Sequence, residues 1–140
     1  MKKVVVGIIG SGFAADLHAC AYQKVYGVEV VMKAVASLAP NAGEFAAAHG
    51  IAEVYTDYRE MLKDPEIDVV DVIAPPFLHE EMIKAAIEHK KHVICEKPLT
   101  GYFGPADGSQ SFTKEEAFRE VQKKLKELRE AVEAGGVKFM

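Results

Sequence analysis

The sequence contains no tryptophan, only two cysteines and no excess of basic residues. It has 17 Lys and Arg against 21 Asp and Glu, so its net charge of −4 lacks the basic footprint of a nucleic-acid-binding protein. Cys20 and Cys95 are too few for the disulfide framework of a small secreted domain. No run reaches the roughly 18 apolar residues of a membrane span. We therefore expect a cytoplasmic protein that binds neither nucleic acid nor membrane.

What the chain does contain is enough apolar sequence, 49% of 140 residues, for one domain with a proper core. Its start, Met1-Lys2-Lys3 followed by an apolar run, superficially resembles a signal peptide. Gly10 and Gly12 interrupt that run and no small-residue cleavage site follows, so we expect no leader here.

The chain is organised around its first 15 residues. Val4–Ile9 is an almost unbroken apolar run, and the letters GSGFAA follow it at positions 10–15, before an Ala-rich amphipathic stretch. A buried strand, a glycine turn and a helix start in this order form a phosphate site, because free N–H groups and the positive end of the helix dipole face the anion. Glycines also mark ordinary turns, but the strand and the helix on either side favour dinucleotide binding. The cofactor contacts expected here are Gly10, Ser11, Gly12, Phe13 and Ala14.

Strand and helix patterns alternate along the rest of the chain. Further strands are predicted at 28–36, 53–55, 68–74 and 92–95, with a sixth beginning at 137–140, and helices at 13–26, 41–49, 57–62, 79–90 and 113–134. Asn41 with Glu44, and Thr113 with Glu116, have the spacing of capping boxes. The alternation predicts one domain over residues 1–140, with a Rossmann-type, doubly wound α/β fold and a mostly parallel sheet. The ligand crevice is expected at the carboxyl ends of strands one, two, four and five.

The end of the second strand decides which nicotinamide nucleotide fits. A carboxylate there would bind the adenosine ribose diol and repel a 2′-phosphate, but this sequence has Ser37. The missing acid favours NADP over NAD, although no arginine follows Ser37 to bind the phosphate. The sequence therefore allows either NAD or NADP as the cofactor and favours NADP slightly.

Four segments together resemble one family. They are the glycine turn with Ala15 and His18, Ile67-Asp68-Val69-Val70, Pro75-Pro76-Phe77-Leu78-His79, and Lys91-His92-Val93-Ile94-Cys95-Glu96-Lys97-Pro98. They resemble the glucose–fructose oxidoreductase/inositol dehydrogenase (Gfo/Idh/MocA) family of nicotinamide-dependent sugar and polyol oxidoreductases, over residues 1–99 and the final helix. The resemblance implies an enzyme that moves a hydride between NAD(P) and a sugar, polyol or similar small molecule. It also implies a second domain with much of the substrate pocket, and nothing in this sequence resembles that domain.

We therefore expect the cofactor-binding portion of a longer, homo-oligomeric enzyme, truncated before the second domain and able to bind nucleotide without turnover. The alternative is a nucleotide-dependent sensor or scaffold that keeps the nucleotide site and lacks catalysis.

The resemblance also assigns roles to the tripeptide after the fifth strand. It implies that Lys97 is catalytic, because a cation near the reacting carbon would stabilise a developing alkoxide or relay its proton. Glu96 would orient Lys97 or contact the nicotinamide ribose, and a cis bond before Pro98 would restrict the lysine's backbone. On chemistry alone, Glu96 and Lys97 are more simply a solvated ion pair.

The resemblance further implies that the proline segment lines the cofactor cleft, so cofactor contacts are expected from Ala74, Pro75, Pro76 and His79. His79 fits equally well as a residue that caps or packs the helix start. His18 is better explained as a packed or hydrogen-bonded helix residue than as a cofactor contact.

Three smaller expectations concern other polar features. Asp71 needs partners if it is buried, and the sequence alone does not decide whether it is. No metal site is expected, since no cluster of Cys and His has ligand spacing. The loop Tyr102–Ser111 is either a lid at the crevice mouth or a disordered connector.

Overall fold

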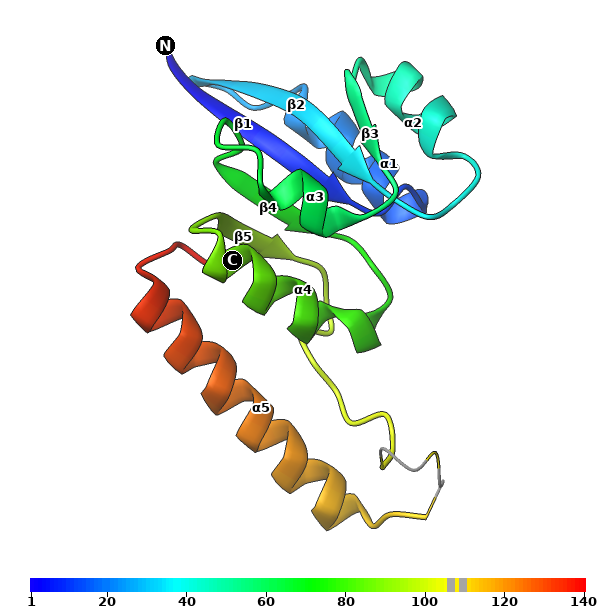
Figure 1. Cartoon of the computed structure of the whole chain (residues 1–140), viewed down its shortest axis with the longest axis vertical. Coiled ribbons are helices and arrows are strands. Elements are labelled where there is room, and N and C mark those ends of the chain that lie inside the picture. Colours follow the sequence, from blue (N-terminus) through cyan, green and yellow to red (C-terminus); the bar gives the residue numbers. More distant parts are fainter. Residues whose placement is uncertain (106–107, 109–110) are drawn as a thin grey trace.

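Five parallel strands form one sheet in the order β3-β2-β1-β4-β5 (Figure 1). The structure, a computed structural model, describes residues 1–105, 108 and 111–140. The strands are β1 Lys2–Ile9, β2 Val28–Ala36, β3 Glu53–Tyr55, β4 Val69–Val72 and β5 His92–Cys95. The helices are α1 Phe13–Tyr22, α2 Ala42–His49, α3 Tyr58–Leu62, α4 Pro76–Glu88 and α5 Lys114–Gly135. The predicted doubly wound, Rossmann-type α/β fold is confirmed.

Helices cover both faces of the sheet, and the side chains of β1 alternate between them. Val6 and Ile8 pack with residues of α1 and α2, whereas Val5 and Ile9 pack with residues of α3 and α4. This alternation follows from the two-residue period of a strand, and apolar residues on both faces are typical of a buried parallel sheet. The helices change face between β1 and β4, so the topological switch point lies at the carboxyl ends of these two strands.

The first and the fourth helix differ from their predicted bounds. α1 ends at Tyr22, four residues early, because Val25 and Tyr26 have little to pack against and are 46% and 99% exposed. α4 begins at Pro76 and not at His79. Proline is tolerated at a first helical position, because the N–H that it lacks has no partner within the helix. The earlier start brings the proline segment to the carboxyl edge of the sheet.

One of the two predicted capping boxes forms. At the start of α5, the Thr113 hydroxyl accepts the N–H of Glu116 (3.1 Å), and the Glu116 carboxylate accepts the N–H of Thr113 (2.7 Å). At the start of α2, Asn41 makes no side-chain cap, so the box predicted with Glu44 is wrong. The Asn41 side chain is used elsewhere, in the glycine turn.

The last residues, where the opening of a sixth strand was predicted, pair with β5 through a single bridge and form no strand of their own. The N–H of Val93 donates to the Lys138 carbonyl oxygen (2.9 Å), and the N–H of Met140 donates to the Val93 carbonyl oxygen (3.0 Å). Val93 and Phe139 form a single parallel bridge.

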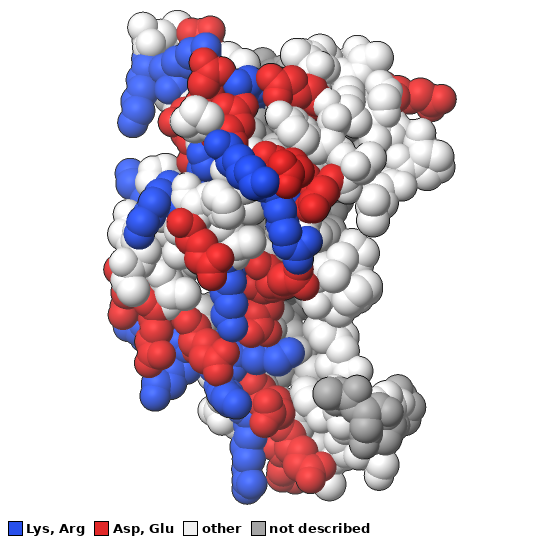
Figure 2. All heavy atoms as spheres, viewed as in Figure 1, with Lys and Arg blue, Asp and Glu red and all other residues white. Residues whose placement is uncertain are grey.

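The long helix α5 lies along α4 and extends beyond the sheet (Figure 1). Leu128 is buried in the core shared with α4, and Lys84 Nζ on α4 is 3.1 Å from Glu127 Oε2 on α5. Figure 2 shows Lys, Arg, Asp and Glu interspersed along the outer side of this helix, in agreement with a solvated face. Within the described residues, no helix is both long enough and apolar enough to cross a membrane.

Candidate functional site

The chain leaves β1 through a turn that requires glycine at its first position. Gly10 has a φ of +113°, and a Cβ there would lie 2.3 Å from the carbonyl oxygen of Ile73. The N–H of Gly10 donates to the Ala36 carbonyl oxygen (2.9 Å). Gly10 therefore joins the ends of β1 and β2 and the segment after β4 at one point, which a side chain would force apart.

The space over the start of α1 is open. Gly12 is the N-cap of this helix, and a Cβ at Gly12 would meet no protein atom within 4 Å. The fold itself thus leaves this position uncrowded, and Gly12 has no side chain with which to cap the first-turn N–H groups. Phe13, 81% exposed, and Ala14 begin the helix there. Backbone donors and the positive end of the helix dipole face a position suited to a phosphate.

Ser11, Ser37 and Asn41 join the glycine turn to the segment after β2. The Ser11 hydroxyl donates to Asn41 Oδ1 (3.1 Å), and Asn41 Nδ2 donates to the Ser11 carbonyl oxygen (2.9 Å). The two serine hydroxyl oxygens are 2.8 Å apart, so Ser37 donates to Ser11, and Ser37 also accepts the N–H of Ala39 (3.1 Å). Sequence reasoning assigned Asn41 to a helix cap and missed this role. The available signal was that Asn41 follows the strand whose end meets the glycine turn.

A cavity of about 750 Å³ opens where these segments meet, at the predicted edge of the sheet. Of the predicted cofactor contacts, its lining includes Gly10, Ser11, Ser37, Ala74 and Pro75. Pro76 is the first residue of α4, directly after this lining. Cofactor sites typically have volumes of about 300–1,000 Å³. The structure therefore brings residues of three separate segments into one cavity of suitable size.

Arg59, in the first turn of α3, lines the same cavity. Its guanidinium carbon is 4.6 Å from the centre of the Tyr58 ring, and its Nη2 donates to Glu81 Oε1. Its Nη1 is 3.7 Å from Asp57 Oδ1. Sequence reasoning looked for an arginine directly after Ser37 and therefore missed Arg59, which reaches the cavity from α3.

Glu96 and Lys97 directly follow β5. The N–H of Glu96 donates to the Val72 carbonyl oxygen (3.0 Å), and Glu96 Oε2 accepts the N–H of Lys97 (3.0 Å). Glu96 therefore holds the backbone of Lys97, while the Lys97 side chain is exposed. The peptide bond between Lys97 and Pro98 is cis. Among the residues that the structure describes, no ion pair joins the Glu96 and Lys97 side chains, in contrast to the solvated pair considered above.

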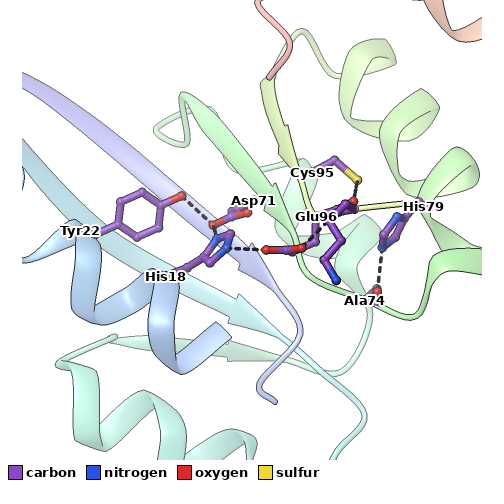
Figure 3. Close-up of polar contacts among 8 residues, drawn as sticks. His18, Tyr22, Asp71, Ala74, His79, Cys95 and Glu96 are labelled. Atoms are coloured by element: carbon purple, nitrogen blue, oxygen red, sulfur yellow. Dashed lines mark hydrogen bonds and ion pairs between the residues drawn. The ribbon is translucent and has the colours of Figure 1, made fainter. Parts of the chain in front are cut away.

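Behind Glu96 lies a cluster of polar side chains from α1 and β4 (Figure 3). His18 Nδ1 is 2.8 Å from Asp71 Oδ2, His18 Nε2 is 3.0 Å from Glu96 Oε1, and the Tyr22 hydroxyl donates to Asp71 Oδ2 (2.6 Å). Asp71 is fully buried, and its Oδ1 has no partner within the described residues. The expectation of a hydrogen-bonded His18 is confirmed, and the partners that Asp71 requires are His18 and Tyr22.

These contacts shift the pKa of each group in the cluster. Burial lowers the pKa of His18, but the hydrogen bonds and charges of Asp71 and Glu96 outweigh it, so the pKa is raised. Burial raises the pKa of Asp71 above its ordinary value, against the hydrogen bonds from Tyr22 and His18. The hydrogen bond from His18, followed by the one from the Lys97 N–H, lowers the pKa of Glu96. Glu96 is thus held as a carboxylate at the base of Lys97.

His79 is fully buried and braces two turns. Its Nε2 is 2.7 Å from the Ala74 carbonyl oxygen (Figure 3). Its Nδ1 is 2.9 Å from the Pro98 carbonyl oxygen. This geometry supports the packing interpretation, and contact between His79 and a cofactor stays a prediction. The brace connects the proline segment to the Glu96-Lys97-Pro98 turn across the crevice edge.

The described part of the Tyr102–Ser111 loop packs near α4 and α5. The rings of Phe103 and Phe77 have centroids 6.3 Å apart, and Lys124 Nζ is 6.0 Å from the centre of the Phe103 ring. Residues 106–107 and 109–110 lie outside the described residues, so the lid and the disordered connector both stay predictions.

Comparison with known sequences decides the family. A sequence model of the Gfo/Idh/MocA oxidoreductases, with an NAD-binding Rossmann fold, matches residues 4–130. The chain belongs to this family. It is 39% identical over 106 residues to levoglucosan dehydrogenase from Pseudarthrobacter phenanthrenivorans, covering 71% of this chain and 27% of that protein. It is 29% identical over 140 residues to myo-inositol 2-dehydrogenase from Thermotoga maritima, covering 94% of this chain and 41% of that protein.

Solved structures of family members agree with this fold. The crystal structure of an NAD binding oxidoreductase from Klebsiella pneumoniae matches 99% of this chain and 33% of its own, with a TM-score of 0.78 and 32% identity. Levoglucosan dehydrogenase in complex with NADH matches 71% of this chain and 28% of its own, with a TM-score of 0.67 and 38% identity. The chain thus corresponds to the NAD-binding part of the Gfo/Idh/MocA oxidoreductases and spans 27–41% of the lengths of these relatives.

Proposed function

We propose that this chain is the cofactor-binding portion of an NAD(P)-dependent oxidoreductase that acts on a CH–OH group or its carbonyl in a sugar, polyol or similar small molecule. The observation that supports it most is the open space over Gly12, at the start of α1 and at the switch point of the sheet. Family membership supports the substrate class, because two relatives are named for the dehydrogenation of levoglucosan and myo-inositol.

Each part of the crevice has a role in this reaction. A bound nicotinamide supplies or accepts the hydride. The first-turn N–H groups of α1 bind the pyrophosphate, while the cavity beside Ser37 takes the adenosine end. Lys97 donates a hydrogen bond to the substrate oxygen, stabilises negative charge as it develops there, and moves the proton to or from it. Glu96, held by His18, positions the backbone of Lys97.

The preferred cofactor is NADP in this proposal. No carboxylate ends β2 to repel a 2′-phosphate, and Arg59 lines the same cavity as Ser37. An arginine is the side chain best suited to a phosphate, because its fork of N–H donors matches the phosphate oxygens. To bind the phosphate, Arg59 exchanges its present partner, Glu81, for the nucleotide.

Calorimetric titration with NADPH and NADH tests the proposal, with Gly12→Asp beside the parent chain. The variant places a negative charge against the pyrophosphate, which costs several kcal/mol and reduces the affinity for both nucleotides by more than about 100-fold. Gly43→Asp is the matched control, since Gly43 lies in the first turn of α2 and a Cβ there meets nothing within 4 Å. Equal binding by the parent and Gly12→Asp would show that the crevice is not the nucleotide site.

The same titration tests the cofactor preference. Arg59→Ala is expected to weaken NADPH binding by about 10-fold or more and to leave NADH binding nearly unchanged, since only NADPH carries the 2′-phosphate. Arg129→Ala on α5, an exposed arginine paired with Glu133, is the control. If NADH binds more tightly than NADPH to the parent chain, the preference is wrong while the crevice assignment stands.

A further inference from the structure

Three side chains with metal-binding atoms meet where α1 and α2 lie side by side. Asp16 and Cys20 are four residues apart on α1, and His49 is the last residue of α2. One ligand atom from each, a carboxylate oxygen, the thiol sulfur and an imidazole nitrogen, lies within 4.8 Å of the other two. His49 Nε2 is already 2.8 Å from Asp16 Oδ1. The cluster lies beside the glycine turn, since Asp16 and His49 line the same hollow as Gly12.

We propose that Asp16, Cys20 and His49 bind a divalent transition metal ion of the zinc type. Sulfur, nitrogen and oxygen donors together match the preference of Zn²⁺, and three protein ligands leave a fourth tetrahedral position for water. Metal–ligand bonds of about 2.0–2.3 Å in a tetrahedron place donor atoms roughly 3.3–3.8 Å apart. The 2.8 Å between His49 Nε2 and Asp16 Oδ1 is below this range, and no pair of the three donor atoms is more than 4.8 Å apart, so rotations of the exposed Asp16 and Cys20 side chains would close the site.

The spacing on α1 supports the same geometry. Residues four apart lie on one face of a helix, one turn above each other, so Asp16 and Cys20 present their donors in the same direction. This is the physical reason why pairs of ligands at this spacing hold a metal ion on a helix, as two histidines do in many zinc enzymes.

His49 is held in place on the other side. Its side chain is only 7% exposed, and its ring packs against Phe45 with centroids 4.8 Å apart. It sits at the carboxyl end of α2, where the negative end of the helix dipole favours a cation. An ordered imidazole and two exposed, adjustable donors therefore face one point.

The proposal departs from the sequence analysis, which expected no metal site. Cys20 and His49 are 29 positions apart, which matches none of the short ligand spacings by which such sites are recognised in a sequence. Metal binding would fix α1 against α2, next to the glycine turn, and would release the Cys20 thiol proton to solvent because the thiolate is the ligand. It does not depend on the proposed oxidoreductase function.

Cobalt(II) titration of the full chain tests the site. The protein is prepared without a histidine tag and with its thiols reduced. A Co²⁺–thiolate bond gives a sulfur-to-metal charge-transfer band, and a tetrahedral site gives intense visible bands. We expect both at one equivalent of Co²⁺, and their loss on addition of one equivalent of Zn²⁺. At a Zn²⁺ concentration of about 100 times Kd, the Tm should rise by about 5–10 °C.

Matched variants decide which residues are the ligands. Cys20→Ser, which retains Cys95, removes the charge-transfer band, and His49→Ala and Asp16→Asn each weaken Co²⁺ binding by more than about 10-fold. His89→Ala, which removes an exposed histidine on the opposite face of the sheet, keeps the parent spectrum. The proposal is overturned if no charge-transfer band forms, or if the spectrum survives substitution of Cys20 or His49.

Discussion

His18 and Glu96 are 78 residues apart in the sequence, yet His18 Nε2 lies 3.0 Å from Glu96 Oε1. The other ring nitrogen of His18 is 2.8 Å from buried Asp71 (Figure 3). A doubly protonated imidazole donates to both carboxylates at once, so this one ring connects α1 to the ends of β4 and β5. Because Glu96 also accepts the N–H of Lys97, the ionisation of His18 is linked to the position of the proposed catalytic lysine.

The raised pKa of His18 gives the first prediction. Glu96→Gln removes one of the two charges that favour the imidazolium, while the amide oxygen still accepts the hydrogen bond from Nε2. The pKa of His18, measured from the NMR titration of its ring protons, is therefore expected to be above 6.5 in the parent chain and lower in the variant. The His89 ring resonances, on the exposed end of α4, serve as the internal reference. A pKa of His18 that is the same in both proteins would contradict this account.

The same shift makes stability depend on pH. A histidine whose pKa is raised on folding adds stability that is fully present below its unfolded value, about 6.5, and is lost as the pH rises through the folded value. The free energy of unfolding of His18→Ala should thus fall below that of the parent chain by more at pH 5.5 than at pH 9. The loss of unfolding free energy at pH 5.5 is expected to exceed the loss at pH 9 by about 1 kcal/mol, because the imidazole is 26% exposed and its charged contacts are partly screened. Urea unfolding of both proteins at the two pH values measures this. If His18→Ala loses as much unfolding free energy at pH 9 as at pH 5.5, or more, the prediction is wrong.

Alanine at two glycines of the same turn is expected to lower the free energy of unfolding by very different amounts. Gly10→Ala places a methyl group 2.3 Å from the Ile73 carbonyl oxygen at a φ of +113°, so it should lower the free energy of unfolding by about 3 kcal/mol or more. Gly12→Ala meets nothing within 4 Å and should cost less than about 1 kcal/mol, the cost of a poorer N-cap. Nucleotide affinity should nevertheless fall in Gly12→Ala, because the methyl group occupies the space over the helix end. Urea unfolding and NADH titration of both variants separate the two effects.

Substitutions of Asn41 and Glu44 show whether Asn41 stabilises the glycine turn through Ser11 or caps α2 together with Glu44. Asn41→Ala removes two hydrogen bonds to Ser11 and should lower the free energy of unfolding by about 1–2 kcal/mol. Because the glycine turn then loses its connection to the segment after β2, nucleotide affinity should fall as well. Glu44→Ala should change neither quantity by much, since no capping box exists at α2. Equal destabilisation by the two substitutions would mean that the sequence-based assignment of a capping box was right after all.

The general architecture was predictable because its signals are local. The apolar run at Val4–Ile9 before two glycines, the alternation of strands with helices, and the proline pair at 75–76 all act on the backbone within a few residues. Such signals place strand ends at one edge of a parallel sheet, and the crevice with Gly10, Ser37 and Ala74 follows from the switch in strand order. Helix ends were less well predicted. α1 stops at Tyr22 and α4 starts at Pro76. Whether the last turn of a helix forms depends more on the apolar surface it buries against the sheet than on the helix propensity of its residues.

What only the tertiary structure decided is which polar side chains meet. Asn41 bonds to Ser11, 30 positions away, Arg59 reaches the cavity of Ser37 from another helix, and His49 joins Asp16 and Cys20. The spacing between Asn41 and Ser11, between Arg59 and Ser37, or between His49 and the α1 pair marks none of these contacts in the sequence, because a strand of the sheet separates the partners along the chain. Sequence determined the fold class, the glycine turn and the position of the crevice, through backbone geometry and the period of apolar residues. The polar contacts in and around the crevice depend on how helices are rotated and packed on the sheet, which only the folded chain specifies.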